Sequence, residues 1–153
     1  MLKQHKPELC IRTGQAPPCN RIKIEMIATN SFMRETIDPA RPVAYWSNLP
    51  GTDGLLPALE ARNIPASFSS DAGQHLCNHI LYSSLYFAEK NNLYHKAGFI
   101  HIPILPRQAH KHGDVPSMPL EISKKALSVI IGHVAKKHRY DKQEKSNPRT
   151  HHC

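Results

Sequence analysis

The chain has 153 residues, of which 40% are hydrophobic and 21% are charged, a composition that suits one globular domain with a single core. No apolar run approaches the ~18 residues that cross a bilayer, and charged residues stand where a secretion signal would be apolar, so we expect a cytoplasmic protein without membrane spans. The formal net charge is +8 at pH 7, but basic residues concentrate after Lys136, and no basic stripe interleaved with aromatics predicts specific nucleic-acid binding. We therefore expect an α/β domain over residues 1–135 and a basic, disordered tail over residues 136–153.

Two strand patterns lie near the start of the chain. Residues 8–13 (ELCIRT) form a short apolar run that ends at a glycine, which predicts a buried strand. Apolar and polar side chains alternate over residues 21–30 (RIKIEMIATN), which predicts a second strand. Glu25 then lies on the face opposite the main apolar row. A carboxylate in that position is either solvated or directed into a site.

The middle of the chain carries weaker signals. Residues 31–41 show little periodicity and predict a loop. Residues 55–62 (LLPALEAR) predict a short helix, in which Pro57 is tolerated only in the first turn. Residues 66–70 (ASFSS) predict a brief strand.

The clearest helical pattern covers residues 74–90, where one face carries Leu76, Ile80, Ser84 and Phe87, with Leu81 and Leu85 beside them. It follows a turn in which Asp71 is expected to cap the helix. Residues 97–105 form a near-continuous apolar run, typical of a strand covered on both faces. A last helix is expected to begin at Pro119. Because strands alternate with helices, the pattern predicts an α/β fold with a largely parallel sheet.

One cysteine and one histidine stand in positions that suit nucleophilic catalysis. Cys77 falls in the first turn of its helix, where the helix dipole and unpaired N–H groups are expected to lower the pKa of its thiol. His101 lies on the following strand, and a strand–helix–strand unit of this length brings the two elements side by side. His101 can act as base and Glu25 can orient its ring. A lone helical cysteine is nevertheless more often a small core residue than a nucleophile, so both interpretations of Cys77 stay open at this point.

Several segments resemble the pyroglutamyl peptidase I family. SSDAGQHLCN at 69–78 resembles the nucleophile motif of that family, and GFIHIPILP at 98–106 resembles its histidine segment. RIKIEMIATN resembles the strand that carries the catalytic glutamate, with Glu25 at the matching place. Four further segments fit in order: GQAPP at 14–18, PVAYWSNLP at 42–50, IPASFSSDAG at 64–73 and PSMPLE at 116–121.

The resemblance implies a cysteine peptidase that removes N-terminal pyroglutamate (5-oxoproline) from peptides through an acyl-enzyme intermediate. Cys77 would be the nucleophile, His101 the base and Glu25 its orienting carboxylate, and Gln15 is a candidate for substrate binding. The implied fold is a three-layer α/β/α sandwich, and family members are commonly homo-oligomers. No metal or organic cofactor is implied.

The sequence also departs from the family pattern. Family members begin with a strand and a G-F-x-P-F-G type loop that helps to form the pyroglutamate pocket, and this sequence starts after that point, as expected of an N-terminally shortened member. The segment between Asn30 and Pro42 is shorter than in the family and lacks the A-R-I-P-D-N motif. Three alternatives follow: an active peptidase with a remodelled pocket, an inactive homologue or truncated gene product that serves at most as a binding protein, or a longer protein whose first segment is encoded upstream.

A metal site is a competing interpretation. The chain has 11 histidines, and His75 and His79 are spaced i, i+4 on one helix. No H-E-x-x-H motif or paired cysteine motif accompanies them, so the sequence favours surface histidines over a metal site. The four cysteines, without a C-x-x-C pair or a secretion signal, do not predict disulfides.

Overall fold

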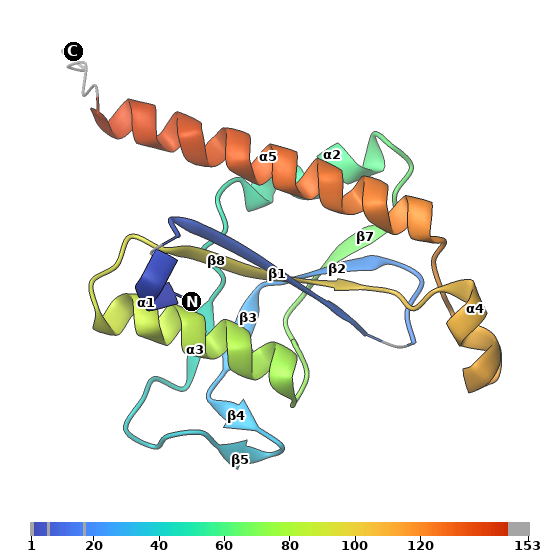
Figure 1. The fold of residues 1–153 in the computed structure, drawn as a ribbon, viewed down its shortest axis with the longest axis horizontal. Coiled ribbons are helices and arrows are strands. Elements are labelled where there is room, and N and C mark those ends of the chain that lie inside the picture. Colours follow the sequence, from blue (N-terminus) through green and yellow to red (C-terminus); the bar gives the residue numbers. More distant parts are fainter. Residues whose placement is uncertain (1, 6, 17, 147–153) are drawn as a thin grey trace.

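The central sheet contains four strands and forms the middle layer of the protein (Figure 1). The strands lie in the order β1 (Leu9–Gln15), β8 (Lys96–Ile102), β2 (Ile22–Glu25) and β7 (Ala66–Ser69). The pairs β1–β8 and β2–β7 are parallel, whereas β8 and β2, which lie side by side in the centre, are antiparallel. The prediction of a mostly parallel sheet is confirmed, with this one antiparallel pairing added.

Helices cover both faces of the sheet. Figure 1 shows α3 (Leu76–Lys90) against one face, and α2 (Thr52–Glu60) together with α5 (Leu120–Ser146) against the other. The three-layer α/β/α arrangement is therefore confirmed. The remaining helices are α1 (Leu2–His5), α4 (Pro106–Ala109) and the 3-10 helix η1 (His110–His112).

The structure is a computed structural model that describes residues 2–5, 7–16 and 18–146. Over these residues, no helix combines the length and the apolar composition needed to cross a membrane. The last seven residues of the predicted tail lie outside the described part of the chain.

The single strand predicted over residues 21–30 is wrong, because the chain leaves the central sheet at Met26. The Met26 N–H donates to the Ser69 carbonyl at 2.8 Å, and the Met26 carbonyl accepts from the Ser47 N–H at 2.7 Å. The chain then continues as β3 (Ile27–Thr29), which pairs with β6 (Ala44–Trp46) in a separate two-stranded sheet. The break leaves Glu25 as the last residue of β2.

A short hairpin occupies part of the predicted loop at residues 31–41. It consists of β4 (Ser31–Phe32) and β5 (Glu35–Thr36), joined by Met33 and Arg34. Both turn residues have positive φ, 50° and 71°. Tight hairpin turns with this backbone usually contain asparagine and glycine, so the sequence carries no turn signal here.

Helix α2 begins earlier than predicted. Residues 55–62 were expected to be helical, but the helix starts at Thr52, so Pro57 lies in its interior and the expectation that it marks the first turn is wrong. A proline there removes one helical hydrogen bond. Burial of Leu55 and Leu59, both fully inaccessible, stabilises the helix against that loss.

Helix α5 extends well past Lys136, so the prediction of a disordered tail is wrong for residues 136–146. Its end is tied to Glu8, just before β1: Lys142 Nζ lies 2.7 Å from Glu8 Oε1, and His138 Nε2 lies 3.2 Å from Glu8 Oε2. These two hydrogen bonds, Lys142 first, lower the pKa of Glu8. The tail prediction failed because partners 130 or more positions away in the sequence anchor the helix.

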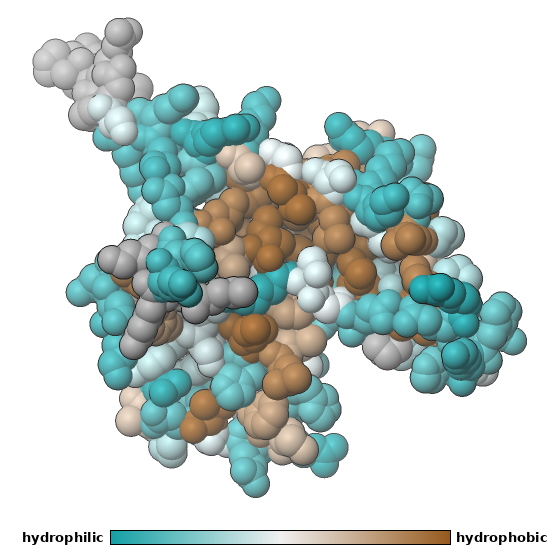
Figure 2. Space-filling model, viewed as in Figure 1, coloured by the Kyte–Doolittle hydropathy of each residue, from teal (hydrophilic) through white to brown (hydrophobic). Residues whose placement is uncertain are grey.

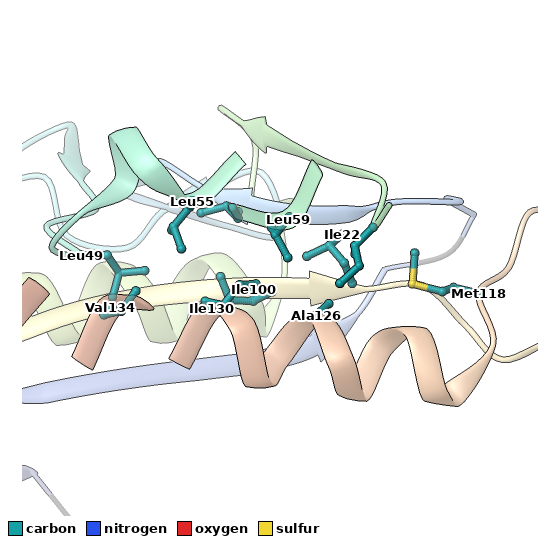
Figure 3. Close-up of a cluster of buried hydrophobic side chains, with 11 residues drawn as sticks. Ile22, Leu49, Leu55, Leu59, Ile100, Met118, Ala126, Ile130 and Val134 are labelled. Atoms are coloured by element: carbon teal, nitrogen blue, oxygen red, sulfur yellow. The ribbon is translucent and has the colours of Figure 1, made fainter. Parts of the chain in front are cut away.

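Two apolar clusters fill the space between the layers. The larger one lies between the sheet and the pair α2 and α5, and Figure 3 shows Ile100 of the sheet facing Ile130 and Val134 of α5. The smaller cluster lies between the sheet and α3, around Leu81, Tyr82 and Phe99. The members of the larger cluster are Ile22, Ile24, Leu49, Leu55, Leu59, Ile64, Ile100, Met118, Ala126, Ile130 and Val134.

Only part of the predicted face of α3 is buried: Ser84, Leu81 and Leu85 are covered, but the N-terminal end of the face is not. Leu76 is 72% exposed and Ile80 is 47% exposed, whereas Leu81, Leu85 and Ala88 are buried.

Apolar residues also gather at the surface between α5 and α3, where β1 forms the edge of the sheet (Figures 1 and 2). This view therefore shows an apolar surface beside the sheet edge.

Candidate active site

A buried carboxylate–imidazole pair lies at the centre of the sheet. Glu25 ends β2, and His101 lies near the end of the antiparallel strand β8. Glu25 Oε1 is 2.7 Å from His101 Nδ1, and the two residues are 0% and 6% exposed. The hydrogen bond assigns the proton to Nδ1 when the ring is neutral, which leaves Nε2 as a proton acceptor. The sequence left open whether Glu25 is solvated or directed into a site, and its burial beside His101 excludes the solvated alternative.

A glycine on the neighbouring strand leaves room for the thiol. Gly14 of β1 lies beside His101 in the sheet register. A Cβ atom at Gly14 would lie 2.9 Å from Phe99 Cζ and 3.3 Å from Cys77 Sγ. The Phe99 ring in turn packs against the His101 ring, with centroids 4.8 Å apart. The absence of a side chain at Gly14 therefore lets the aromatic ring and the thiol approach the strand.

Cys77 is the second residue of α3 and is half-buried. The turn before the helix uses Gly73 with φ +83°, a conformation that favours glycine. Asp71 accepts the Gly73 N–H at 2.8 Å, so it stabilises the turn and does not cap the helix as predicted. The residue that precedes α3, His75, makes no capping hydrogen bond with its side chain. The first N–H groups of α3 thus remain available near the thiol.

Asn78 fixes the position of the cysteine-bearing turn. Its side chain is 1% exposed, and its Oδ1 accepts the Thr29 N–H at 2.8 Å. Its Nδ2 donates to the Thr29 and Ser31 carbonyls at 2.9 and 2.7 Å. One side chain therefore satisfies three backbone groups of the β3–β4 segment and joins them to α3.

The prediction of a lowered thiol pKa is wrong for Cys77. Burial raises the pKa of the Cys77 thiol, and the negative charge of Glu25 raises it further, while the backbone N–H of Cys77 acts in the opposite direction. The sequence suggested only the helix N-terminus and not the nearby buried carboxylate. The thiol is therefore protonated at neutral pH in the free protein and needs a base to remove its proton.

The predicted site residues meet at one cleft of about 410 Å³. Cys77, His101, Glu25 and Gln15 all line it, although no hydrogen bond joins the thiol to His101 among the described residues. Catalytic hydrogen bonds are often long in a ligand-free protein, so this does not exclude proton transfer. The full lining is Gln15, Ala16, Lys23, Glu25, Asp71, Ala72, Gly73, Gln74, His75, Cys77 and His101.

Gln15 has a partner that the sequence analysis missed. Its Nε2 donates to Gln108 Oε1 at 3.0 Å, and Gln108 Nε2 donates back to Gln15 Oε1 at 3.2 Å. Gln108 Oε1 also accepts the Leu105 N–H at 2.8 Å. Because the two glutamines are 93 positions apart, no local pattern could have revealed the pair.

His75 and His79, considered as metal ligands, belong to no larger ligand cluster in the part of the chain that the structure describes. Within the described residues, no group of three or more His, Cys, Asp or Glu side chains is placed to hold a metal ion. His79 packs edge-on against Phe32, with ring centroids 5.1 Å apart. Cys10, Cys19 and Cys77, the cysteines within the described residues, are free.

Comparison with known proteins shows to which family the chain belongs. The family model described as pyroglutamyl peptidase matches residues 1–137. The chain belongs to the pyroglutamyl peptidase family. A pyrrolidone-carboxylate peptidase of Thermoanaerobacter sp. (strain X514) is 37% identical over 150 residues, a match that covers 90% of this chain and 73% of that relative. The resemblance found in the sequence motifs is thereby confirmed.

Solved structures of pyroglutamyl peptidase family members agree. Pyrrolidone carboxyl peptidase from Thermococcus litoralis matches with a TM-score of 0.84 and 32% identity, covering 92% of this chain and 71% of that one. A mutant of the Pyrococcus furiosus protein (A199P) matches with a TM-score of 0.81 and 34% identity, covering 89% and 73%. Family membership supports a peptidase function for this chain.

Proposed function

We propose that the protein is a cysteine peptidase that removes N-terminal pyroglutamate from peptides. The observation that carries this proposal is the single cleft lined by Cys77, His101 and Glu25, in which the carboxylate lies 2.7 Å from the imidazole. A nucleophile, a base and a group that orients the base are the parts required for covalent acyl transfer. The family names supply the substrate class, because the relatives are pyrrolidone-carboxylate peptidases.

In the first half of the reaction, His101 Nε2 takes the thiol proton while Cys77 Sγ attacks the pyroglutamyl carbonyl carbon. A C–S bond forms, and the carbonyl oxygen becomes an oxyanion. The raised pKa of the Cys77 thiol makes this proton transfer necessary at neutral pH. Glu25 stabilises the resulting imidazolium through its buried hydrogen bond. The C–N bond then breaks, and His101 gives its proton to the leaving amine.

In the second half, water attacks the thioester and gives a proton to His101. The C–S bond breaks, pyroglutamic acid leaves, and the thiol regains its proton. We infer that the first N–H groups of α3, which the His75 side chain does not cap, stabilise both oxyanions, because these groups have no intrahelical partner and lie in the turn that carries Cys77. Each step therefore uses only this chain's own groups and water.

Gln15 is our candidate for recognition of the pyroglutamyl ring. It lies at the end of β1 and lines the same cleft as the thiol. A primary carboxamide offers an N–H donor beside a C=O acceptor, and the lactam of pyroglutamate offers the same two groups in the complementary order. Two hydrogen bonds between them would select the ring over an open side chain.

The decisive experiment measures release of a fluorophore from a pyroglutamyl amide. We expect the unmodified protein to release it and Cys77→Ala to release none. Cys10→Ala is the matched control, because Cys10 is also free and half-buried but does not line the cleft. A folded sample of the unmodified protein that releases no fluorophore would overturn the proposal and favour an inactive homologue.

A further inference from the structure

The carboxamides of Gln15 and Gln108 form a closed pair. Both hydrogen bonds, 3.0 and 3.2 Å long, join the same two amide groups in opposite directions. Each side chain therefore uses its oxygen and the N–H next to that oxygen on a single edge. Gln108 belongs to α4, which begins a few residues after the strand that carries His101, whereas Gln15 itself lines the cleft.

That edge of Gln15 is the one a cyclic amide would need. A lactam holds its C=O and N–H on the same side of a ring, so it can pair with a carboxamide through two hydrogen bonds. The outer N–H and the outer lone pair of Gln15 point in different directions and cannot both reach one lactam. Gln108 presents to Gln15 the same donor and acceptor that a lactam would present.

We propose that Gln108 occupies the lactam-recognition edge of Gln15 in the free protein, and that a lactam ligand must displace it. This inference rests on the proposed function, because that function makes Gln15 the group that binds the pyroglutamyl ring. Gln108 is then a specificity-determining residue that competes with the substrate. It keeps the polar edge of Gln15 paired until a group with two complementary hydrogen bonds arrives, and a ligand with only one such bond displaces it poorly.

Displacement of Gln108 is feasible. Gln15 is exposed and Gln108 is half-buried, so water can reach the groups that the exchange leaves open. The Leu105 N–H, which donates to Gln108 Oε1 at 2.8 Å, loses its partner when the side chain rotates away. The hydrogen bonds that Gln108 makes keep Gln15 paired in most molecules, so only a fraction of the protein is ready to bind a lactam. The apparent Kd is the intrinsic Kd divided by that fraction.

The test compares two small probes that need no turnover. 2-Pyrrolidone is a five-membered lactam with a free N–H, and N-methyl-2-pyrrolidone is the same ring without that donor. Each is titrated against the protein and followed by NMR. The variants are Gln108→Ala, which removes the competitor, and Gln108→Glu, which keeps an acceptor for the Leu105 N–H but cannot donate to Gln15. Arg107→Ala is the control, because Arg107 is exposed on the same short helix and has no hydrogen bond or ion pair within the described residues.

We expect Gln108→Ala to bind 2-pyrrolidone with a roughly three- to tenfold lower Kd than the unmodified protein, as removal of about one net hydrogen bond of competition implies. Gln108→Glu should show a smaller gain, and Arg107→Ala should match the unmodified protein. N-methyl-2-pyrrolidone, which lacks the N–H donor, should bind every form of the protein more weakly than 2-pyrrolidone does. Unchanged or weaker lactam binding in both Gln108 variants would overturn the inference. Tighter lactam binding without cleavage of a pyroglutamyl amide would overturn the proposed function and leave the role of Gln108 intact.

Discussion

Replacement of Asn78 by alanine should destabilise the protein strongly, because this one side chain satisfies three backbone groups in a buried position. Its loss leaves the Thr29 N–H and the carbonyls of Thr29 and Ser31 without their partner. Thr29 is exposed and Ser31 is half-buried, so water recovers part of the loss. At about 1 kcal/mol for each group, the free energy of unfolding should fall by about 3 kcal/mol. In a chain of this length that corresponds to a drop in Tm of about 6–12 °C.

The assay is thermal unfolding followed by circular dichroism, with Asn91→Ala as the matched control. Asn91 is the exposed residue that follows α3, and its Nδ2 donates to a single carbonyl, that of Phe87. Its replacement should change the free energy of unfolding by no more than about 0.5 kcal/mol. Equal losses in the two variants would refute the reasoning. Asn78→Asp gives a further check, because it places a carboxylate oxygen against two carbonyls and should be less stable at neutral pH than at acid pH.

Two further predictions concern charged groups. Glu25→Gln should lower the pKa of the Cys77 thiol, because it removes a negative charge that raises this pKa, yet it should reduce turnover roughly a hundredfold or more, because His101 loses its orienting carboxylate. The pH dependence of iodoacetamide alkylation measures the pKa of the thiol, and the rate of fluorophore release measures turnover. Slower alkylation of Glu25→Gln at neutral pH would contradict the predicted fall in the thiol pKa. Glu8 has a lowered pKa, chiefly through Lys142, so its contribution to stability is present at neutral pH and is lost as the pH falls through the carboxyl range. Glu8→Gln should therefore lower Tm at pH 7 but not at about pH 2, and an equal loss at both would count against the ion pair.

The sequence predicted those site residues whose positions follow from local periodicity. Alternation along β2 placed Glu25 on the face away from the apolar row, and the length of the α3–β8 unit placed His101 beside Cys77. Neither inference needed knowledge of distant contacts. The residues that we propose for the reaction could therefore be selected from short windows together with the family motifs.

Features that depend on distant partners were missed or wrong. The pairing of Gln15 with Gln108 joins residues 93 positions apart, and the pKa of Cys77 depends on a carboxylate from another strand. Helical periodicity likewise placed Leu76 on the apolar face of α3, although its side chain is 72% exposed. Local patterns give the face and the type of an element, but the neighbours that cover that face are set by the tertiary fold.

The order of strands in the sheet has a consequence for synthesis of the protein. The two strands that flank β8 are translated long before it, and the hydrogen bond between Glu25 and His101 joins residues 76 positions apart. Until Ile102 has left the ribosome, β1 and β2 lack the strand that lies between them, and their apolar side chains remain uncovered. Exposed apolar surface makes such nascent chains prone to aggregation, and the closure of long loops slows their folding. The cleft is therefore completed only when the last of these distant strands has paired.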